Sequence, residues 1–135
     1  MSKEGWKNHP LVNQSQIKEE SLKIKKSIEY YRNGDIWREK WHIKGDEYYL
    51  HKENGPAHIS YYDTGKKDYE GWYINNKLHR IDGPAHISYY KDGTVRFEHY
   101  YINGERLSKK QWENHLLRQE YLVKKTLKCL LDILS

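Results

Sequence analysis

The chain has 135 residues, a hydrophobic content of 36%, an aromatic content of 14% and a formal net charge of +5. This length suits one domain, because single hydrophobic cores become marginal below roughly 60 residues and divide above about 250. The 13 tyrosines and 5 tryptophans argue against a disordered chain, since aromatic rings bury large surfaces. Residues 1–29 hold six lysines against four acids, residues 108–135 hold six basic residues against three acids, and residues 30–107 are balanced. Because the excess positive charge lies at the two ends, charge alone does not predict nucleic-acid binding.

The cysteine content and the hydropathy pattern bound the compartment. Cys129 is the single cysteine, which excludes an internal disulfide and a zinc knuckle and fits a reducing environment. No charged leader followed by an apolar stretch opens the chain, and no run of about 18 apolar residues occurs in it. We therefore expect a soluble cytoplasmic protein that does not enter a membrane.

Residues 1–26 form a polar N-terminal segment, which we expect to act as a cap on the rest of the chain. The middle of the chain is repetitive. Residues 55–62 and 83–90 both read Gly-Pro-Ala-His-Ile-Ser-Tyr-Tyr, so the second copy starts 28 residues after the first. A weaker copy aligns at an offset of 31 residues and carries three extra residues near 47–49, which we expect in a loop.

One repeat unit has the pattern of a β-hairpin. Residues 85–90 read as a short strand, 91–93 as a turn and 94–102 as the return strand. Asn103-Gly104 is among the strongest two-residue hairpin signals. Together the copies at 27–54, 55–82 and 83–107 predict a mainly β protein, an antiparallel meander of about three hairpin repeats with a period of 28 residues.

Alternation along the strands assigns two faces to the predicted sheet. One face carries Ile59, Tyr61, Ile87 and Tyr89. The opposite face carries His58, Ser60, Tyr62 and their equivalents in the next copy. Half of the aromatic side chains are therefore expected in the core, and the outward half are candidates for binding.

Residues 108–135 predict an amphipathic α-helix that caps the sheet. Ser108 and Gln111 have the spacing of a capping box, and apolar residues then recur at helical spacing from Trp112 to Leu134. The last turns are apolar nearly all round, which predicts a contact with a partner helix or a second copy. The predicted interface residues are Leu127, Leu130, Leu131 and Leu134.

The segment Trp72-Tyr73-Ile74-Asn75, followed by His79-Arg80-Ile81-Asp82-Gly83-Pro84-Ala85, resembles MORN-like hairpin repeats. More narrowly, it is similar to the His-Arg-x-Asp-Gly-Pro-Ala variant found in bacteriophages and large DNA viruses. The resemblance covers about residues 27–107. It implies a scaffold or binding role without catalysis, in a viral protein of the host cytoplasm.

The motif around His79, Arg80 and Asp82, echoed by His51 and Lys52, suggests a phosphate site. A cation beside an imidazole, followed by a glycine turn with free backbone N–H groups, can hold an anion by charge-assisted hydrogen bonds. The alternative is structural, with Asp82 capping its turn while the cations lie over aromatic rings. The predicted ligand-binding residues are His51, Lys52, Tyr62, Trp72, His79, Arg80, Asp82 and Tyr90.

We predict no catalytic residue, no metal site and no cofactor. Equivalent histidines two strands apart would lie about 9–10 Å apart, too far to share a metal ion. No nucleophile, phosphate-loop or metalloprotease motif occurs. The leading hypothesis is a non-enzymatic binding module that inhibits a host protein or sequesters a nucleotide signal as counter-defence, with a phosphate-bearing small ligand as the second kind of partner. The alternatives are a structural protein-interaction scaffold, and nucleic-acid binding through the basic termini.

Overall fold

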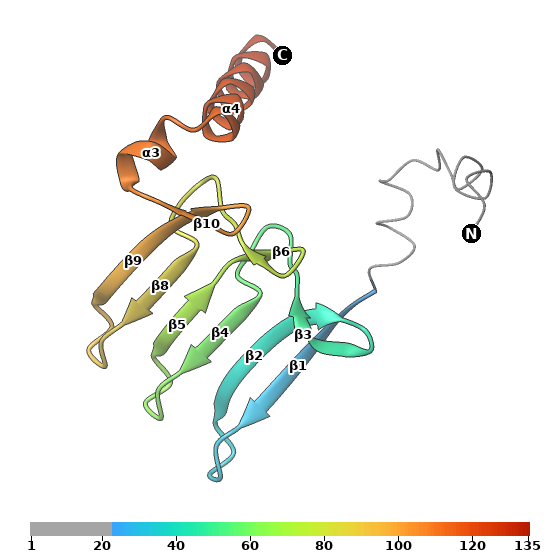
Figure 1. The fold of residues 1–135 in the computed structure, drawn as a ribbon, viewed down its shortest axis with the longest axis vertical. Coiled ribbons are helices and arrows are strands. Elements are labelled where there is room, and N and C mark those ends of the chain that lie inside the picture. The colour runs from blue at the N-terminus through green and yellow to red at the C-terminus, as the bar shows by residue number, and fades with distance from the viewer. Residues whose placement is uncertain (1–22) are drawn as a thin grey trace, which may run out of the picture.

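The computed structural model describes residues 23–135, so the predicted cap at 1–26 lies almost entirely outside the described residues. Its strands form three long hairpins that lie side by side (Figure 1). The hairpins are built from β1 (Ile24–Tyr30), β2 (Ile36–Ile43), β4 (His58–Tyr61), β5 (Lys67–Gly71), β8 (His86–Tyr89) and β9 (Val95–Ile102). The shorter strands are β3 (Asp46–Leu50), β6 (Tyr73–Ile74), β7 (Lys77–Leu78) and β10 (Glu105–Leu107).

Strands that follow one another along the chain also follow one another across the sheet. The order is β1-β2-β4-β5-β8-β9-β10, with β3 paired to β2, and β6 and β7 form a separate two-stranded sheet. All the pairings are antiparallel. The prediction of a mainly β meander followed by a C-terminal helix is therefore confirmed.

Each long hairpin turns in the same way because each has glycine at the same place. Gly34, Gly65 and Gly93 have φ angles of 92°, 86° and 92°, a region that glycine enters without steric cost. The backbone N–H of Gly93 donates to the carbonyl of Tyr90 at 2.9 Å, and the other two glycines make equivalent bonds. The strand register shifts just before each turn, between Ser88 and Tyr89 in the last hairpin. The repeated sequence therefore repeats the local geometry, including a β-bulge.

The strand register places matching residues in rows across the sheet. Directly paired residues form one row on the face that we call the Ile/Glu face: Ile28, Glu39, Ile59, Glu70, Ile87 and Glu98. The adjacent row lies on the opposite face, which we call the imidazole face: Ser27, Lys40, His58, Gly71, His86 and His99. The predicted assignment of Ile59 and Ile87 to one face and His58 to the other agrees with this register.

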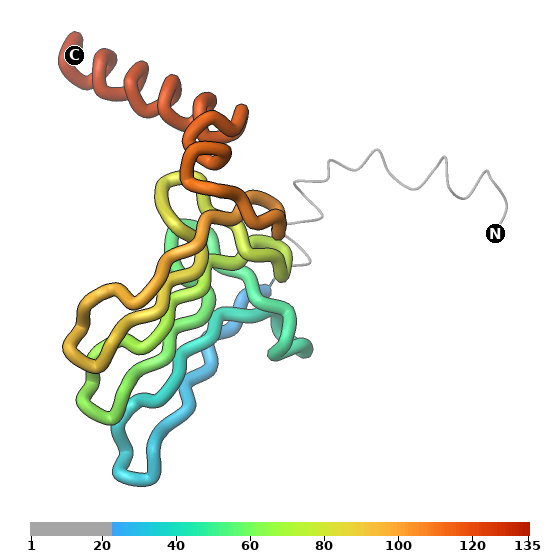
Figure 2. The backbone as a smooth tube through the Cα atoms, turned by 60° about the vertical axis from the view of Figure 1, so that its left-hand side comes forward, coloured from blue at the N-terminus to red at the C-terminus, as the bar shows by residue number. Residues whose placement is uncertain are grey.

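The sheet is a single layer. Figures 1 and 2 show no helix or second sheet stacked on either face within residues 23–135. The small core lies at one end, where Tyr100, Ile102 and Trp112 are buried and Leu107 and Leu117 pack against them. Most ring side chains of the sheet therefore pack against neighbouring strands instead of a second layer.

The C-terminal region begins as predicted and then departs from the prediction. The Ser108 hydroxyl accepts from the Gln111 backbone N–H, and the Gln111 side chain accepts from the Ser108 N–H, which confirms the capping box. The expected continuous helix is wrong, because the chain forms α3 (Lys109–Glu113) and α4 (Leu116–Leu134). His115 between them is extended at φ −65° and ψ 140°, and its side chain caps the N-terminus of α4.

Two further details differ from what the sequence suggested. The three extra residues near 47–49 do not lie in a loop, since they belong to β3, which pairs with the end of β2. The cap on the sheet is mainly α3, whereas α4 has no buried residue and, beyond its first turns, extends away from the sheet (Figure 2). None of the helices in the described part of the chain is long and apolar enough to span a lipid bilayer.

Candidate binding surface

The predicted histidines His51 and His79 each bond the backbone of a turn in the neighbouring repeat unit. The Nδ1 atom of His51 accepts the backbone N–H of Asn75 at 2.8 Å, and Nδ1 of His79 accepts that of Asn103 at 3.0 Å. Both asparagines have positive φ, 49° and 51°. Each histidine therefore holds the tight turn of the following repeat unit, and this bond requires an unprotonated Nδ1.

Arg80 has three partners, two of them within its own loop. Its guanidinium carbon lies 3.6 Å from the centre of the Trp72 ring. Nε donates to Asp82 at 2.8 Å, and a terminal nitrogen donates to the Pro84 carbonyl at 3.0 Å. A β-carbon on Gly83 would lie 2.8 Å from the guanidinium carbon, which explains glycine at that position. The His-Arg-x-Asp-Gly-Pro-Ala motif thus forms one packed loop around this guanidinium.

Lys52 repeats this arrangement in the preceding unit. Its Nζ lies 3.6 Å from the centre of the Trp41 ring, and a β-carbon on Gly55 would lie 3.1 Å from Nζ. Burial lowers the pKa of Lys52, and the positive charge of Lys26 lowers it further. Both predicted cations therefore lie over aromatic rings, as the structural alternative describes.

The structure brings five of the eight predicted ligand-binding residues together. A shallow depression of about 450 Å³ is lined by Lys52, Trp72, His79, Arg80 and Asp82, together with part of α4 through Tyr121. Tyr62 and Tyr90 lie at the opposite end of the hairpins, next to the turns. Tyr62 donates its hydroxyl to the Tyr89 carbonyl at 2.6 Å, whereas the Tyr90 ring is 52% exposed.

A chain of ring contacts crosses the imidazole face over four strands. The rings of His58 and Tyr69 have centroids 5.0 Å apart, and Tyr69 and His86 are 5.1 Å apart. His86 then contacts Phe97 at 5.4 Å, and Phe97 stacks on His99 at 5.0 Å. We call these five residues the ring strip. Tyr73 of β6 contacts Tyr69 at its edge, with the two hydroxyls 3.3 Å apart, and no other layer of the described chain is stacked on the strip.

Gly71 makes room for the middle of the ring strip. It stands in the row between His58 and His86, and a β-carbon there would lie 2.6 Å from the Tyr73 ring and still closer to Tyr69. Because no side chain projects at Gly71, the Tyr69 ring lies across it and contacts both histidines. The same position is Lys40 in the first hairpin and His99 in the third.

The imidazoles of the ring strip are held neutral near pH 7. Burial lowers the pKa of His58 to about 4, and the charges of Arg38 and Lys40 lower it further. Burial also lowers the pKa of His86 and of His99. The Nε2 atom of His58 is enclosed and has no hydrogen-bond partner among residues 23–135. The ring strip is therefore an uncharged aromatic surface.

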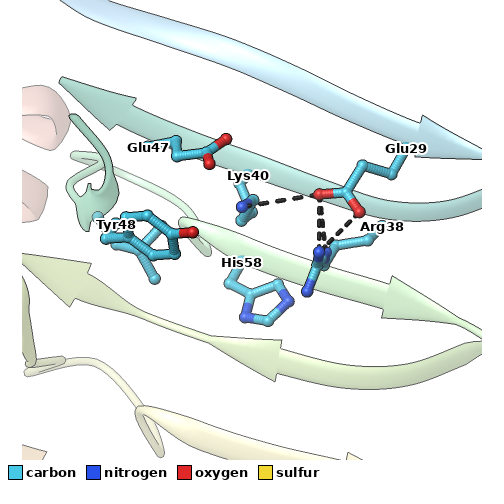
Figure 3. A pocket seen from close by; sticks show the side chains of 7 residues that line it. Glu29, Arg38, Lys40, Glu47, Tyr48 and His58 are labelled. Carbon is cyan, nitrogen blue, oxygen red and sulfur yellow. Dashed lines mark hydrogen bonds and ion pairs between the residues drawn. The ribbon is translucent and has the colours of Figure 1, made fainter. Parts of the chain in front are cut away.

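A charged depression borders the ring strip at His58 (Figure 3). It has a volume of about 440 Å³, and its lining includes Glu29, Arg38, Lys40 and Glu47. The Glu29 carboxylate accepts two hydrogen bonds from one guanidinium nitrogen of Arg38, at 2.7 and 2.6 Å, and lies 3.6 Å from the Lys40 Nζ. Those contacts of Arg38, first its hydrogen bond and then the Coulomb attraction, hold the Glu29 pKa below its usual value.

The sequence did not single out Tyr69, Phe97 or His99 for this surface. The strand alternation that assigned His58 and His86 to an outward face could have included them. Their contact, however, depends on cross-strand register, which joins Ser88 to both Tyr69 and Phe97.

The remaining predicted residues lie apart from both depressions. Leu127, Leu130, Leu131 and Leu134 on α4 are 54%, 51%, 67% and 83% exposed. Within the described chain, no group of three or more His, Cys, Asp or Glu side chains is arranged to hold a metal ion. His86 and His99 do approach each other, with their Nδ1 atoms 3.4 Å apart.

Fold and surface together define a single-layer antiparallel meander of β-hairpins with an uncovered aromatic strip. Comparison with protein-family profiles, with curated protein sequences and with solved structures finds no match to the chain. The resemblance to MORN-like repeats stays a prediction from the motif.

Proposed function

We propose that this protein is a non-enzymatic binding module that holds a partner protein on the imidazole face. The observation that carries the proposal is the ring strip, a continuous line of five rings on a sheet face that no other layer of residues 23–135 covers. Aromatic residues are enriched where proteins bind each other, and charged residues are depleted from the centre of such contacts. Neutral imidazoles beside Tyr69 and Phe97 have this composition.

The rim of the ring strip has the polar character of an interface edge. Glu29, Arg38 and Lys40 form a charged cluster next to His58 and pair with one another in the free protein. A partner that places apolar side chains on the rings can place a polar or charged group in this depression. Rim charges of this kind contribute to orientation and association rate more than to affinity.

The predicted phosphate site is a weaker candidate for the main function. Arg80 already bonds Asp82 and the Pro84 carbonyl, and it lies on Trp72, so a phosphate would compete with these contacts. A protein partner also agrees with what the repeat resemblance implies. For a viral chain, the partner would be a host protein that the module binds and blocks.

Affinity capture with matched variants tests the proposal. We expect the double variant Phe97→Ala/His99→Ala to lose a bound protein that the unchanged chain retains. Ile36→Ala is the control, because Ile36 is 37% exposed against 36% for Phe97 and pairs with Tyr30 on the Ile/Glu face. The captured protein is then purified and titrated against each variant, with circular dichroism as the check that both variants fold.

Other outcomes point to other functions. A partner that both variants bind equally would contradict the assignment of the imidazole face. A rise in melting temperature with a nucleotide panel, lost in Arg80→Ala, would instead support a phosphate-bearing ligand. Binding to nucleic acid that falls steeply with salt would support the basic ends of the chain as the functional surface.

A further inference from the structure

The two junctions between neighbouring hairpins follow the same pairing rule. Between the first and second hairpins, Glu39 pairs with Ile59, and the Trp41 N–H donates to the Ala57 carbonyl at 2.8 Å. The same two pairs recur between the second and third hairpins. There, the residues that correspond to Glu39 and Trp41 lie 31 positions further along the chain, and those that correspond to Ile59 and Ala57 lie 28 positions further along. Glu70 then pairs with Ile87, and the Trp72 N–H donates to the Ala85 carbonyl at 2.8 Å.

Two tyrosine hydroxyl bonds also recur at both junctions. The Tyr61 hydroxyl donates to Glu39 at 2.6 Å, and the Tyr89 hydroxyl donates to Glu70 at 3.2 Å. In the other direction, Tyr31 donates to the Tyr61 carbonyl at 2.7 Å and Tyr62 donates to the Tyr89 carbonyl at 2.6 Å. Each junction therefore uses one tyrosine from each of the two hairpins.

The two outer edges of the sheet carry the residue types that form these junctions. The edge strand β1 is equivalent to β4 and β8, and the edge strand β9 is equivalent to β2 and β5. In the described part of the chain, β1 has no strand on its outer side, and β10 covers only Tyr100, Tyr101 and Ile102 of β9. Tyr30 occupies the place of Tyr61 and is 58% exposed; Tyr90 occupies the place of Tyr62 and is 52% exposed.

We propose that β9 of one copy of this chain pairs with β1 of a second copy, as a third junction of the same kind. The internal junctions set its register: Phe97 opposite Glu29, Glu98 opposite Ile28, and His99 opposite Ser27. The Tyr30 hydroxyl of the second copy then donates to Glu98, and the Tyr90 hydroxyl donates to the carbonyl of that Tyr30. The Ile/Glu row continues unbroken from one copy into the next.

The helices leave this edge of β9 open. Trp112 of α3 packs on Tyr100 with ring centroids 4.7 Å apart, and Arg118 lies over Trp112 at 4.4 Å. Tyr100 is the repeat equivalent of Trp72. Trp112 packs on the Tyr100 ring in the way that Arg80 packs on the Trp72 ring. Both helices lie at the end of the sheet opposite the hairpin turns, away from residues 95–99 (Figure 1).

Such a contact joins two different edges, so it is heterologous. Each added copy presents the same pair of free edges, and association therefore continues beyond a dimer unless the chain of copies closes into a ring. This self-association uses the sheet edges and is independent of the partner on the imidazole face.

Sedimentation over a range from micromolar to near-millimolar concentrations tests the proposal on the full chain. The average mass is expected to rise with concentration above the 16.4 kDa of one chain. It should also rise in Leu127→Glu/Leu130→Glu, which makes α4 charged and removes the helix as a source of association. A constant monomer mass in that variant would overturn the proposal.

Edge variants in the same α4-charged background provide the decisive comparison. Glu98→Lys sets a cation close to Lys26 of the second copy and should abolish association, while the fold persists because Glu98 is exposed. Tyr90→Phe removes one hydrogen bond and should weaken association about fivefold. Tyr62→Phe, its internal counterpart, should lower the melting temperature instead. Association that survives Glu98→Lys unchanged would place the contact elsewhere and sink the proposal.

Discussion

The ring of Tyr69 lies across the backbone of Gly71, and a β-carbon at Gly71 would overlap it. This relationship places Tyr69 between His58 and His86 at centroid distances of 5.0 and 5.1 Å. The ring strip is continuous because Gly71, two residues after Tyr69 on β5, has no side chain.

Gly71→Ala should destabilise the fold by about 1–3 kcal/mol, because Tyr69 and Tyr73 must move away from the new methyl group. Denaturant unfolding measures this loss, and amide shifts of residues 58 and 86 report the displaced ring. Gly65→Ala is the comparison, since no atom lies within 4 Å of its added β-carbon and only its φ of 86° opposes the substitution. If the shifts at residues 58 and 86 are equal in the two variants, Tyr69 does not depend on Gly71.

Arg80→Ala should lower the free energy of unfolding by about 1–3 kcal/mol, because it removes the contact with Trp72 and the bonds to Asp82 and Pro84. Arg80→Lys should cost less, since Lys52 makes the equivalent contact with Trp41. Urea unfolding of the two variants measures the difference. A stability that Arg80→Ala leaves unchanged would favour a ligand-binding role for this guanidinium instead.

Stability should fall as the pH drops from about 6.5 toward 4. Burial lowers the pKa of His58 from 6.5 to about 4 in the folded protein, so over this interval the unfolded chain binds a proton that the folded one does not. The expected loss is on the order of 1–2 kcal/mol, reduced because the ring is partly exposed. His86 and His99 contribute in the same direction, since burial lowers their pKa as well.

Melting temperatures measured across this pH interval test the prediction. His58→Phe keeps an aromatic ring and removes the titrating group, so its stability should depend on pH less steeply. An equal pH dependence in the variant and the unchanged chain would show that His58 is not the group responsible.

Truncation after Lys128 should leave the stability of the sheet unchanged, because α4 buries no residue against it. The truncation removes Leu130, Leu131 and Leu134, which are exposed on the free helix. If these leucines join two copies, as their pattern predicts, the mass in solution at a given concentration should decrease. Sedimentation of the full and truncated chains compares the two, and an unchanged mass would contradict the predicted helix contact.

Much of the architecture could be predicted from local patterns. The alternation in residues 85–90, the glycine turns and the pair Asn103-Gly104 specify strands and turns from short-range preferences alone. The exact repeat also implied that equivalent residues share a face. Local patterns were less informative where nonlocal contacts decide. Residues 47–49 belong to β3 because Asp46 and Leu50 on either side of them pair with β2, and His115 divides the predicted helix.

The candidate surface needed the assembled sheet. The sequence identified Arg80 and Lys52 as cations beside glycine turns, but a phosphate site and a stack on tryptophan have the same local pattern. Only the folded structure distinguishes these two arrangements, because Trp72, which directly follows β5, contacts Arg80 only when the chain has folded. Tyr69 and Phe97 likewise meet His86 through strand register and not through their spacing in the chain.

By itself, the sequence determined the hairpins, their turns and the faces of the strand residues in the repeated octapeptide, since these arise from backbone preferences and two-residue periodicity. The tertiary structure alone decided that the described sheet is one layer, that five rings meet across it, and that each of its two edges exposes a tyrosine, Tyr30 on β1 and Tyr90 beside β9. The physical reason is that burial and cross-strand contact depend on which strands become neighbours and what covers them, and these relationships arise only when distant segments are packed together.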